Sequence, residues 1–405
     1  MDIKKFKLLF YLQLFLFSTI PLLSVKFLRI NLSSFSIPIF FIFVITGIAM
    51  YFFANNYSKE LRVDRNTLVF IALLLLFLIY QFLNSFKNIT TFSFINSIDE
   101  VVKTFSSLIV FIFIFYFLKN TIYKEPKQLF KLFNILLIIS TIILIILIIR
   151  YYFHFNSKYL GIILEYRTEA GKNQLALYLG IVFPIVLSTY REKKNLFSLI
   201  CLFVHIFAII YVDSRGVLIS LFLSYYFVFV FLSKRYFIQI ISIFSIFLFF
   251  IYVTIYFLNN YSFIIEKFNT YNAITDIHLY RSDQMREILA AKSIYFFVSA
   301  PFFGIGTNQF LSQVGYLTHN SFLQILCEQG IFGLTIFLLI LLVVLLTIKN
   351  LFNKSNKYEK SLLISSLVPI FYFTFINAYN LILIYIFWAL LFILNNYKLS
   401  YDNRF

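Results

Sequence analysis

Apolar segments of about twenty residues recur along almost the whole chain, whose 405 residues are 61% hydrophobic and 21% aromatic. Because a helix rises about 1.5 Å per residue, such a segment crosses a bilayer, where every backbone group must be paired within the protein. We therefore predict an all-α, polytopic membrane helix bundle of about twelve transmembrane helices, forming a single membrane domain over residues 1–405. The predicted spans are 8–28, 35–54, 67–86, 104–118, 129–149, 173–190, 196–212, 216–232, 236–258, 320–348, 361–376 and 380–395.

Positive charge is unevenly distributed between the loops. The chain has 34 Lys and Arg against 17 Asp and Glu, a formal net charge of +17. The cations gather in alternate loops, from Lys4 near the start to Lys398 near the end, and loops rich in Lys and Arg stay in the cytoplasm. This pattern predicts both termini in the cytoplasm and no nucleic-acid partner. The first apolar segment is expected to be a retained helix rather than a signal peptide.

Most loops on the predicted outer side are short, and residues 259–319 form the large exception. Long loops carry function more often than short ones. Within this loop we predict a helix over 283–298, with Ser282 as its cap and apolar side chains on one face. A helix of this kind is expected to lie against the membrane surface.

Residues 299–333 are the most informative stretch, because they hold five of the ten glycines and one of the four histidines, His319. The tenth span begins with a polar half that contains Asn320 and Glu328, and its continuous apolar run starts only at Ile331. A carboxylate in lipid costs roughly 2.5–3.5 kcal/mol by insertion scales. Glu328 is therefore expected to face protein or water.

His319 lies at the predicted N-terminus of the tenth span. The partial positive charge of a helix N-terminus disfavours the imidazolium, so we expect a neutral ring. A neutral imidazole at the membrane surface can take a proton from a hydroxyl group. Helix capping or a purely interfacial position is the alternative explanation for His319.

On the outer side, where cations are otherwise scarce, four arginines and Lys172 are candidates for one cluster; the arginines are Arg167, Arg215, Arg281 and Arg286. A guanidinium stays charged and binds phosphate oxygens in pairs, so this cluster is expected to hold an anionic lipid head group. Ion pairs with neighbouring acids, or anchoring at the interface, are the alternatives. The chain has no Asp-x-Asp pair and no Cys/His cluster, so we predict no metal and no cofactor.

These motifs follow one another in a recognisable order. They are an Arg before a span, Ser214-Arg215-Gly216 between spans, Arg286 ahead of Pro301-Phe-Phe-Gly-Ile-Gly306, then His319-Asn-x-x-Leu323, and Glu328-x-Gly-x-x-Gly333. This order resembles the bacterial O-antigen ligase and polymerase superfamily, membrane glycosyltransferases that carry a large periplasmic loop. The resemblance in topology covers the whole chain, and the motifs cover about 160–335.

The resemblance implies a reaction on the periplasmic face of the bacterial inner membrane. A glycan linked to undecaprenyl diphosphate would be transferred to an acceptor sugar hydroxyl without a metal or nucleotide. His319 would be the base, and Arg215 and Arg286 would hold the diphosphate. The remaining predicted substrate-binding residues are Arg167, Arg281, Asn320 and Glu328.

Three functions remain open at this point. A ligase, which we favour, would transfer to lipid A–core in lipopolysaccharide biosynthesis, whereas a polymerase would transfer to another lipid-linked glycan. A flippase or transporter of lipid-linked oligosaccharides belongs to a different class, but such proteins carry mid-span charges and repeated halves, which this sequence lacks. A purely structural scaffold would leave the His and Arg cluster unexplained.

Overall fold

A computed structural model describes most of the chain from residue 63 onward and a small hairpin before it. The described residues are 29–32, 35–38, 63–87, 91–124, 138, 141–142, 169–212, 214–231, 251, 255, 259, 261–275, 277, 282–375, 379 and 381–402. Their elements are β1 (Arg29–Leu32), β2 (Phe35–Pro38), α3 (Arg65–Ser85), α4 (Thr91–Lys124), α7 (Glu169–Lys193), α8 (Leu196–Val212), α9 (Arg215–Phe231), α11 (Tyr261–Ala273), α12 (Ser282–Ser299), α13 (Gln309–Val314), α14 (Ser321–Phe352), α15 (Lys357–Tyr372) and α16 (Ile382–Asp402).

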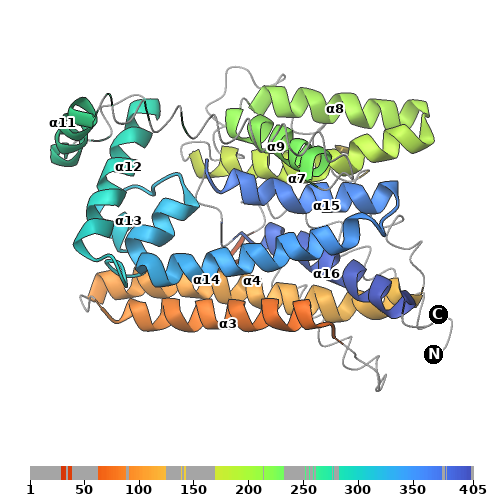
Figure 1. Ribbon diagram of the computed structural model, residues 1–405, viewed down its shortest axis with the longest axis horizontal. Helices are drawn as coiled ribbons and strands as arrows, with labels where there is room; N and C mark the ends of the chain where they lie inside the picture. The colour runs from red at the N-terminus through yellow and green to blue at the C-terminus, as the bar shows by residue number, and fades with distance from the viewer. Residues whose placement is uncertain are drawn as a thin grey trace.

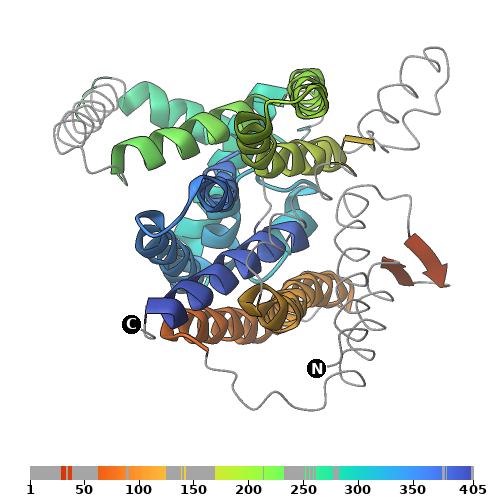
Figure 2. The same cartoon turned by 90° about the vertical axis from the view of Figure 1, so that its right-hand side faces the viewer.

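The long helices form two layers of a bundle. Helices α3, α4, α14 and α16 lie on one side, and α7, α8, α9 and α15 lie on the other (Figure 1, Figure 2). Helix α15 packs against α7 and α9, and its contacts with α14 and α16 join the two layers. Helix α12 runs across one end of the bundle, where α14 begins and α15 ends (Figure 1). We call this the α12 end.

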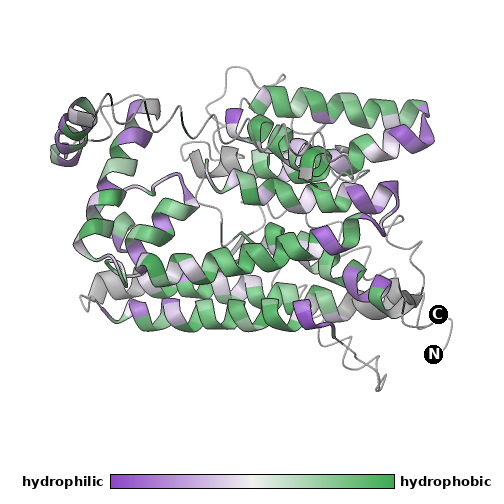
Figure 3. Cartoon of the chain, viewed as in Figure 1, coloured by the Kyte–Doolittle hydropathy of each residue, from purple (hydrophilic) through white to green (hydrophobic). Residues whose placement is uncertain are grey.

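The described helices fit a membrane protein. Three stretches are long and apolar enough to cross a bilayer: α3, residues Leu175–Lys193 of α7, and α14. Hydrophobic residues cover the middle of the bundle, and hydrophilic residues gather at its two ends (Figure 3). The count of twelve spans and the side on which the large loop lies remain predictions. The predicted span 8–28 lies outside the described residues, as do most of 35–54, 129–149 and 236–258.

The described part of the chain is helical, as predicted, apart from one short hairpin. Strands β1 and β2 pair antiparallel, with Arg29 opposite Pro38 and Leu32 opposite Phe35. Residues 35–38 were expected to begin the second span. Their sequence, Phe-Ser-Ile-Pro, alternates apolar with polar or turn-forming residues, and this period of two favours a strand over a helix.

Aromatic rings fill the interior between α3, α4 and α16. Phe70 is fully buried, with its ring centroid 4.7 Å from that of Phe111 and 5.8 Å from that of Trp388. In lipid the hydrophobic effect does not drive helices together, so close packing of this kind holds the bundle. In the other layer Gly180 allows α7 to approach its neighbours, because an added Cβ would lie 3.2 Å from a methyl group of Val368.

A polar cluster around Asp64 closes the end of the bundle opposite α12. The Asp64 carboxylate caps α3 by accepting from the Asn66 amide (3.1 Å), and it also accepts from the side chains of Thr67, Asn395 and Asn396. The Asp64 backbone N–H donates to the Asn396 side-chain oxygen at 2.9 Å. These bonds fasten the start of α3 to the last turns of α16.

Candidate functional site

Helix α14 is broken at Gly330, which has φ 66° and ψ −166°. A Cβ at this position would lie 2.3 Å from the carbonyl oxygen of Phe302. Downstream of the break, the backbone N–H groups of Ile331 and Phe332 donate to Pro301 (2.9 Å) and Phe302 (3.3 Å). The glycine-rich segment 300–308, which we call the glycine loop, thus replaces the missing turn of α14.

The same loop also pairs with the helix upstream of the break. Ile305 and Gly306 donate from their backbone N–H groups to the carbonyls of Cys327 and Glu328, each at 2.9 Å. Gly304 has φ 70°, and a Cβ on it would lie 2.2 Å from the backbone of Glu328. Two backbones can approach this closely only where a residue has no side chain, which explains why glycines concentrate here.

The C-terminal end of α3 supplies hydrogen bonds to the broken region. Asn84 donates to the Glu328 carbonyl at 2.8 Å, Tyr80 donates to the Gln329 carbonyl at 2.7 Å, and Lys87 donates to a carbonyl of the glycine loop at 3.0 Å. Our sequence reasoning missed these residues. Their spacing of four and three residues marks one polar face at the end of an apolar helix, which was the available signal.

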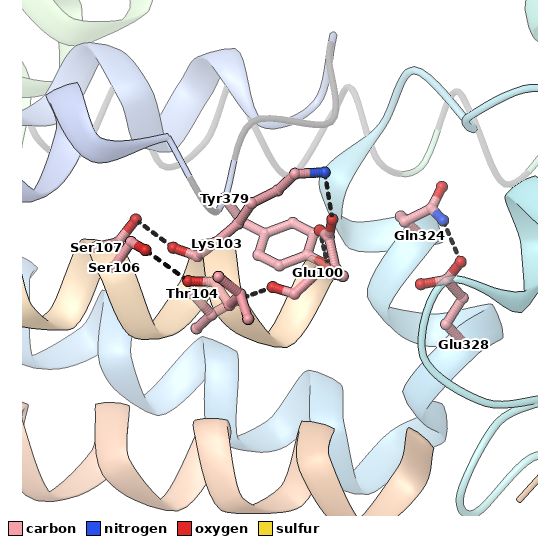
Figure 4. Close-up of polar contacts among 9 residues, drawn as sticks. Glu100, Lys103, Thr104, Ser106, Ser107, Gln324, Glu328 and Tyr379 are labelled. Carbon is pink, nitrogen blue, oxygen red and sulfur yellow. Dashed lines mark hydrogen bonds and ion pairs between the residues drawn. The ribbon is translucent and has the colours of Figure 1, made fainter. Parts of the chain in front are cut away.

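Glu328 faces protein, as predicted. Its side chain is 1% exposed, and its Oε1 accepts from the backbone N–H of Phe310 (3.2 Å) and from Nε2 of Gln324 (2.5 Å) (Figure 4). The partners described for this carboxylate are therefore protein groups that hold the glycine loop and α13 against α14.

A second buried carboxylate, Glu100 of α4, lies nearby and was not predicted. It accepts from the Tyr379 hydroxyl at 2.9 Å and from Nζ of Lys103 at 3.4 Å (Figure 4). Glu100 and Glu328 are close enough for their charges to interact. The predicted span 104–118 placed Glu100 in a loop, but α4 already begins at Thr91 and buries this residue, which is only 7% exposed.

His319 immediately precedes α14, as predicted. The helix cap is Asn320, whose side chain accepts from the Leu323 amide at 3.0 Å and donates to the Thr374 carbonyl at 3.1 Å. His319 is half-buried and has φ 54°, in the left-handed region that residues with a Cβ rarely adopt. Such conformations cluster at functional sites, where the surroundings must hold them in place.

One short turn at the end of α15, Tyr372–Phe375, contacts the other parts of the predicted site. Its Phe373 carbonyl accepts from the Ser321 amide at 2.8 Å, next to His319 and Asn320. The Tyr372 hydroxyl shares a hydrogen bond of 3.4 Å with Ser214, at the start of α9. The turn therefore joins the N-termini of α9 and α14.

Two other elements bring Arg215 and Arg286 into the neighbourhood of this turn. Gly216 packs on it so closely that an added Cβ would lie 2.9 Å from Cβ of Phe375, and this contact places the exposed Arg215 beside the turn. Arg286 of α12 is half-buried and close enough to act electrostatically on the Tyr372 hydroxyl. Among the described residues, the buried Nε of Arg286 has no hydrogen-bond partner.

Helix α12 confirms the helix predicted over 283–298, and part of its apolar face is buried within the protein. Ile288 and Leu289 are 0% exposed and belong to a core cluster with Phe310 and Cys327. This face packs against apolar residues of α13 and α14. That packing fixes the position of Arg286. The position of α12 at a membrane surface stays a prediction.

Residues next to His319 and Arg215 thus contact a single turn, and the charge of Arg286 acts on the same turn. That the three side chains form one site stays a prediction. Arg167 and Arg281 lie outside the described residues. Within the described parts of the chain, no group of three or more His, Cys, Asp or Glu side chains could hold a metal ion.

Comparison with known protein families gives a match for part of the chain. Residues 197–338 match the family model described as O-antigen ligase, a stretch that runs from α8 into α14 and includes Arg215, Arg286 and His319. No curated protein matches the chain. The match confirms the resemblance carried by the motifs, and it places residues 197–338 in the O-antigen ligase and polymerase superfamily of membrane proteins.

Proposed function

We propose that the chain is a metal-independent glycosyltransferase of the bacterial inner membrane. It moves a glycan from undecaprenyl diphosphate to an acceptor sugar hydroxyl on the periplasmic face, with lipid A–core as the acceptor. The observation that supports this proposal is the turn Tyr372–Phe375, which contacts Ser321 beyond His319, contacts Ser214 and Gly216 on either side of Arg215, and lies within the electrostatic reach of Arg286. The α12 end of the bundle is then the periplasmic end.

The two arginines hold the diphosphate. A guanidinium donates in pairs to phosphate oxygens and is never deprotonated, so it neutralises the leaving group throughout the reaction. The buried Nε of Arg286, which has no partner among the described residues, is a donor of this kind. Arg215 is exposed and can approach the same group from α9.

His319 is the general base. It takes the proton of the acceptor hydroxyl, and the oxygen attacks the anomeric carbon from the side opposite the diphosphate. The new glycosidic bond forms as the bond to the diphosphate oxygen breaks, so the configuration at the anomeric carbon inverts. Undecaprenyl diphosphate leaves with its charge held by the arginines.

The other predicted site residues have subsidiary parts. The side chain of Asn320 is engaged in capping α14 and in bonding Thr374, so it orients the residue before it. Arg167 and Arg281 add positive charge around the donor.

A reconstituted transfer assay tests this function. Purified protein in vesicles receives an undecaprenyl-diphosphate-linked glycan and lipid A–core, and donor binding is measured separately. We expect His319→Ala to lower transfer by about 10²–10⁴-fold while donor binding persists. We expect Arg215→Ala and Arg286→Ala to weaken donor binding. Arg191→Ala is the matched control, since Arg191 is exposed in the last turn of α7.

Each outcome separates one alternative. Wild-type transfer in His319→Ala would remove the proposed base, and unchanged donor binding in both arginine variants would remove the diphosphate site. Products that grow only on lipid-linked glycans would identify a polymerase. Movement of the glycan lipid across the vesicle without a new glycosidic bond would identify a transporter.

A further inference from the structure

Two polar side chains lie one turn apart on the buried face of α14, directly after His319. Gln324 and Glu328 are each 1% exposed and occupy the polar half of the helix, before the break at Gly330. Positions i and i+4 lie on the same helix face, so the two side chains meet. Nε2 of Gln324 donates to Oε1 of Glu328 at 2.5 Å (Figure 4).

The Gln324 side chain also reaches back to the residue before His319. Its Oε1 accepts from the backbone N–H of Thr318 at 3.0 Å, and Thr318 is 2% exposed. A backbone N–H can only donate, so the Gln324 oxygen must face Thr318 and its NH₂ group must face Glu328. Glu328 must then accept. The polarity of the whole chain of hydrogen bonds is fixed.

At its far end, this chain of hydrogen bonds is anchored in the first turn of α13 and in the glycine loop. Glu328 Oε1 accepts from the Phe310 amide at 3.2 Å, and the Glu328 carbonyl accepts from Gly306 at 2.9 Å. At the other end, Thr318 Oγ1 donates to the Asn320 carbonyl at 2.7 Å and accepts from the Asn320 amide at 3.2 Å. The residue between Thr318 and Asn320 is His319.

We propose that Gln324 and Glu328 are positioning residues that keep His319 in its left-handed conformation and aimed at the acceptor hydroxyl. The proposal rests on the proposed function of His319 as the base. A positive φ is unfavourable for a residue with a Cβ, so it persists only where the backbone on both sides is held. Gln324 holds the upstream side, Asn320 holds the downstream side, and Glu328 orients Gln324. On this proposal neither Gln324 nor Glu328 touches the substrate, and the positioning part of Glu328 replaces the substrate-binding part predicted from the sequence.

The test exchanges the two side chains. In Gln324→Glu, a second buried carboxyl group replaces the amide donor, so the assay is run at alkaline pH, where both groups are ionised and the bond to residue 328 is lost. We expect kcat to fall about 10²-fold, the size of effect that a misplacement of about 1 Å can cause, with KM for the donor unchanged. In the double variant Gln324→Glu/Glu328→Gln, the carboxylate now at position 324 accepts from both Thr318 and the new amide at position 328, and the net charge is restored.

We expect kcat of the double variant to be at least about tenfold higher than kcat of Gln324→Glu, because the exchange restores part of the geometry that the single variant loses. A full return is not expected, because Phe310 shares Oε1 of Glu328 with Gln324. Kinetics of the double variant no better than those of Gln324→Glu, or a loss that appears in KM, would overturn the proposal. If the carboxylate of Glu328 bound the substrate directly, the double variant would not recover kcat, because the exchange moves the negative charge by one helical turn.

Hydrogen exchange gives a readout that does not depend on transfer. The amide of Thr318 should exchange faster in Gln324→Glu than in the wild type, and the double variant should restore its protection. Unchanged exchange in Gln324→Glu would reject the chain of hydrogen bonds even if transfer fell. Full activity of His319→Ala would instead reject the base, and the exchange data would still decide whether Gln324 holds Thr318.

Discussion

The two ends of α3 both carry polar clusters, but they differ in how complete those clusters are. At Asp64, the carboxylate, Asn395 and Asn396 all find partners within the cluster. At the other end, the side-chain amides of Gln81 and Gln329 are fully buried and have no hydrogen-bond partner among the described residues. The nearby Arg286 Nε is in the same condition.

This difference indicates what each end does. Buried polar groups in a membrane protein cost several kcal/mol each when they are unsatisfied, so a finished cluster such as that of Asp64 stabilises the fold. At the other end, the buried donors and acceptors of Gln81, Gln329 and Arg286 have no partner among the described residues, so a bound ligand could form hydrogen bonds with them. This contrast supports the proposal that the α12 end, where α14 is broken and glycines replace side chains, is the end that binds the substrates.

Of the substitutions that test this comparison, those of the glycines at the break in α14 should lower transfer activity the most. Gly304→Ala and Gly330→Ala should each lower transfer by about 10²-fold or more, because the added Cβ would lie 2.2 or 2.3 Å from backbone atoms and would push the glycine loop away from α14. Transfer per folded molecule is the measurement.

Gly315→Ala is the matched control for both glycine variants. Gly315 also has a positive φ, 82°, but an added Cβ meets nothing within 4 Å. This variant should lose only about 1–2 kcal/mol of folding free energy for the left-handed backbone and should keep its activity. Equal losses in all three variants would show that backbone strain, rather than close approach, explains the glycines.

A smaller effect tests the finished cluster. Asp64→Ala removes the cap of α3 and one acceptor each from the buried amides of Asn395 and Asn396, so the free energy of unfolding should fall by about 1–3 kcal/mol. Thermal unfolding in detergent measures this loss. Transfer per folded molecule should stay at the wild-type level. A fall in transfer would mean that the two ends of α3 are coupled, and the contrast between them would be lost.

The smallest effect is expected at the exposed ion pair between α11 and α12. Nζ of Lys267 lies 2.7 Å from the Glu287 carboxylate, and this hydrogen bond lowers the pKa of Glu287 below its ordinary value of 4.5. A lowered carboxylate pKa stabilises the folded state above the ordinary pKa, and the gain is lost as pH falls through the lowered value. Both side chains are about half exposed, so the gain is below about 1 kcal/mol.

Thermal unfolding of the wild type and Glu287→Gln between pH 7 and pH 3 measures this pair. The difference between the two proteins should be constant above about pH 4.5 and should shrink at lower pH. A difference that persists at the acidic limit would show that packing, rather than charge, joins α11 to α12.

Much of the helical framework could be predicted, because a continuous apolar run marks a helix wherever its flanks are polar. Helix α8 spans 196–212 as predicted, and α12 agrees with the prediction to within one residue at each end. The polar half of α14 was also visible as a late start of its apolar run. The sequence did not reveal the break at Gly330, since a glycine within a helix pattern is also compatible with an unbroken helix.

The partners of the site could not be predicted for a different reason. Tyr80 and Asn84 bond residues 249 and 244 positions away in the chain. In an apolar helix, periodicity does not show which face meets which neighbour, because lipid and protein favour the same side chains. Glu100 fell in a predicted loop for a related reason. The hydrogen-bond partner that allows its burial in a helix, Tyr379, lies 279 residues later in the chain.

The turn Tyr372–Phe375 also has a consequence for biosynthesis. Ser214, Ser321 and Asn320 all dock on residues that are synthesised after them. A nascent chain that has emerged only as far as α14 therefore carries His319 and both arginines but lacks the turn Tyr372–Phe375 on which Ser214, Asn320 and Ser321 dock. If the proposed function holds, the site is completed only when α15 has inserted, so a chain that ends before α15 is expected to lack transferase activity.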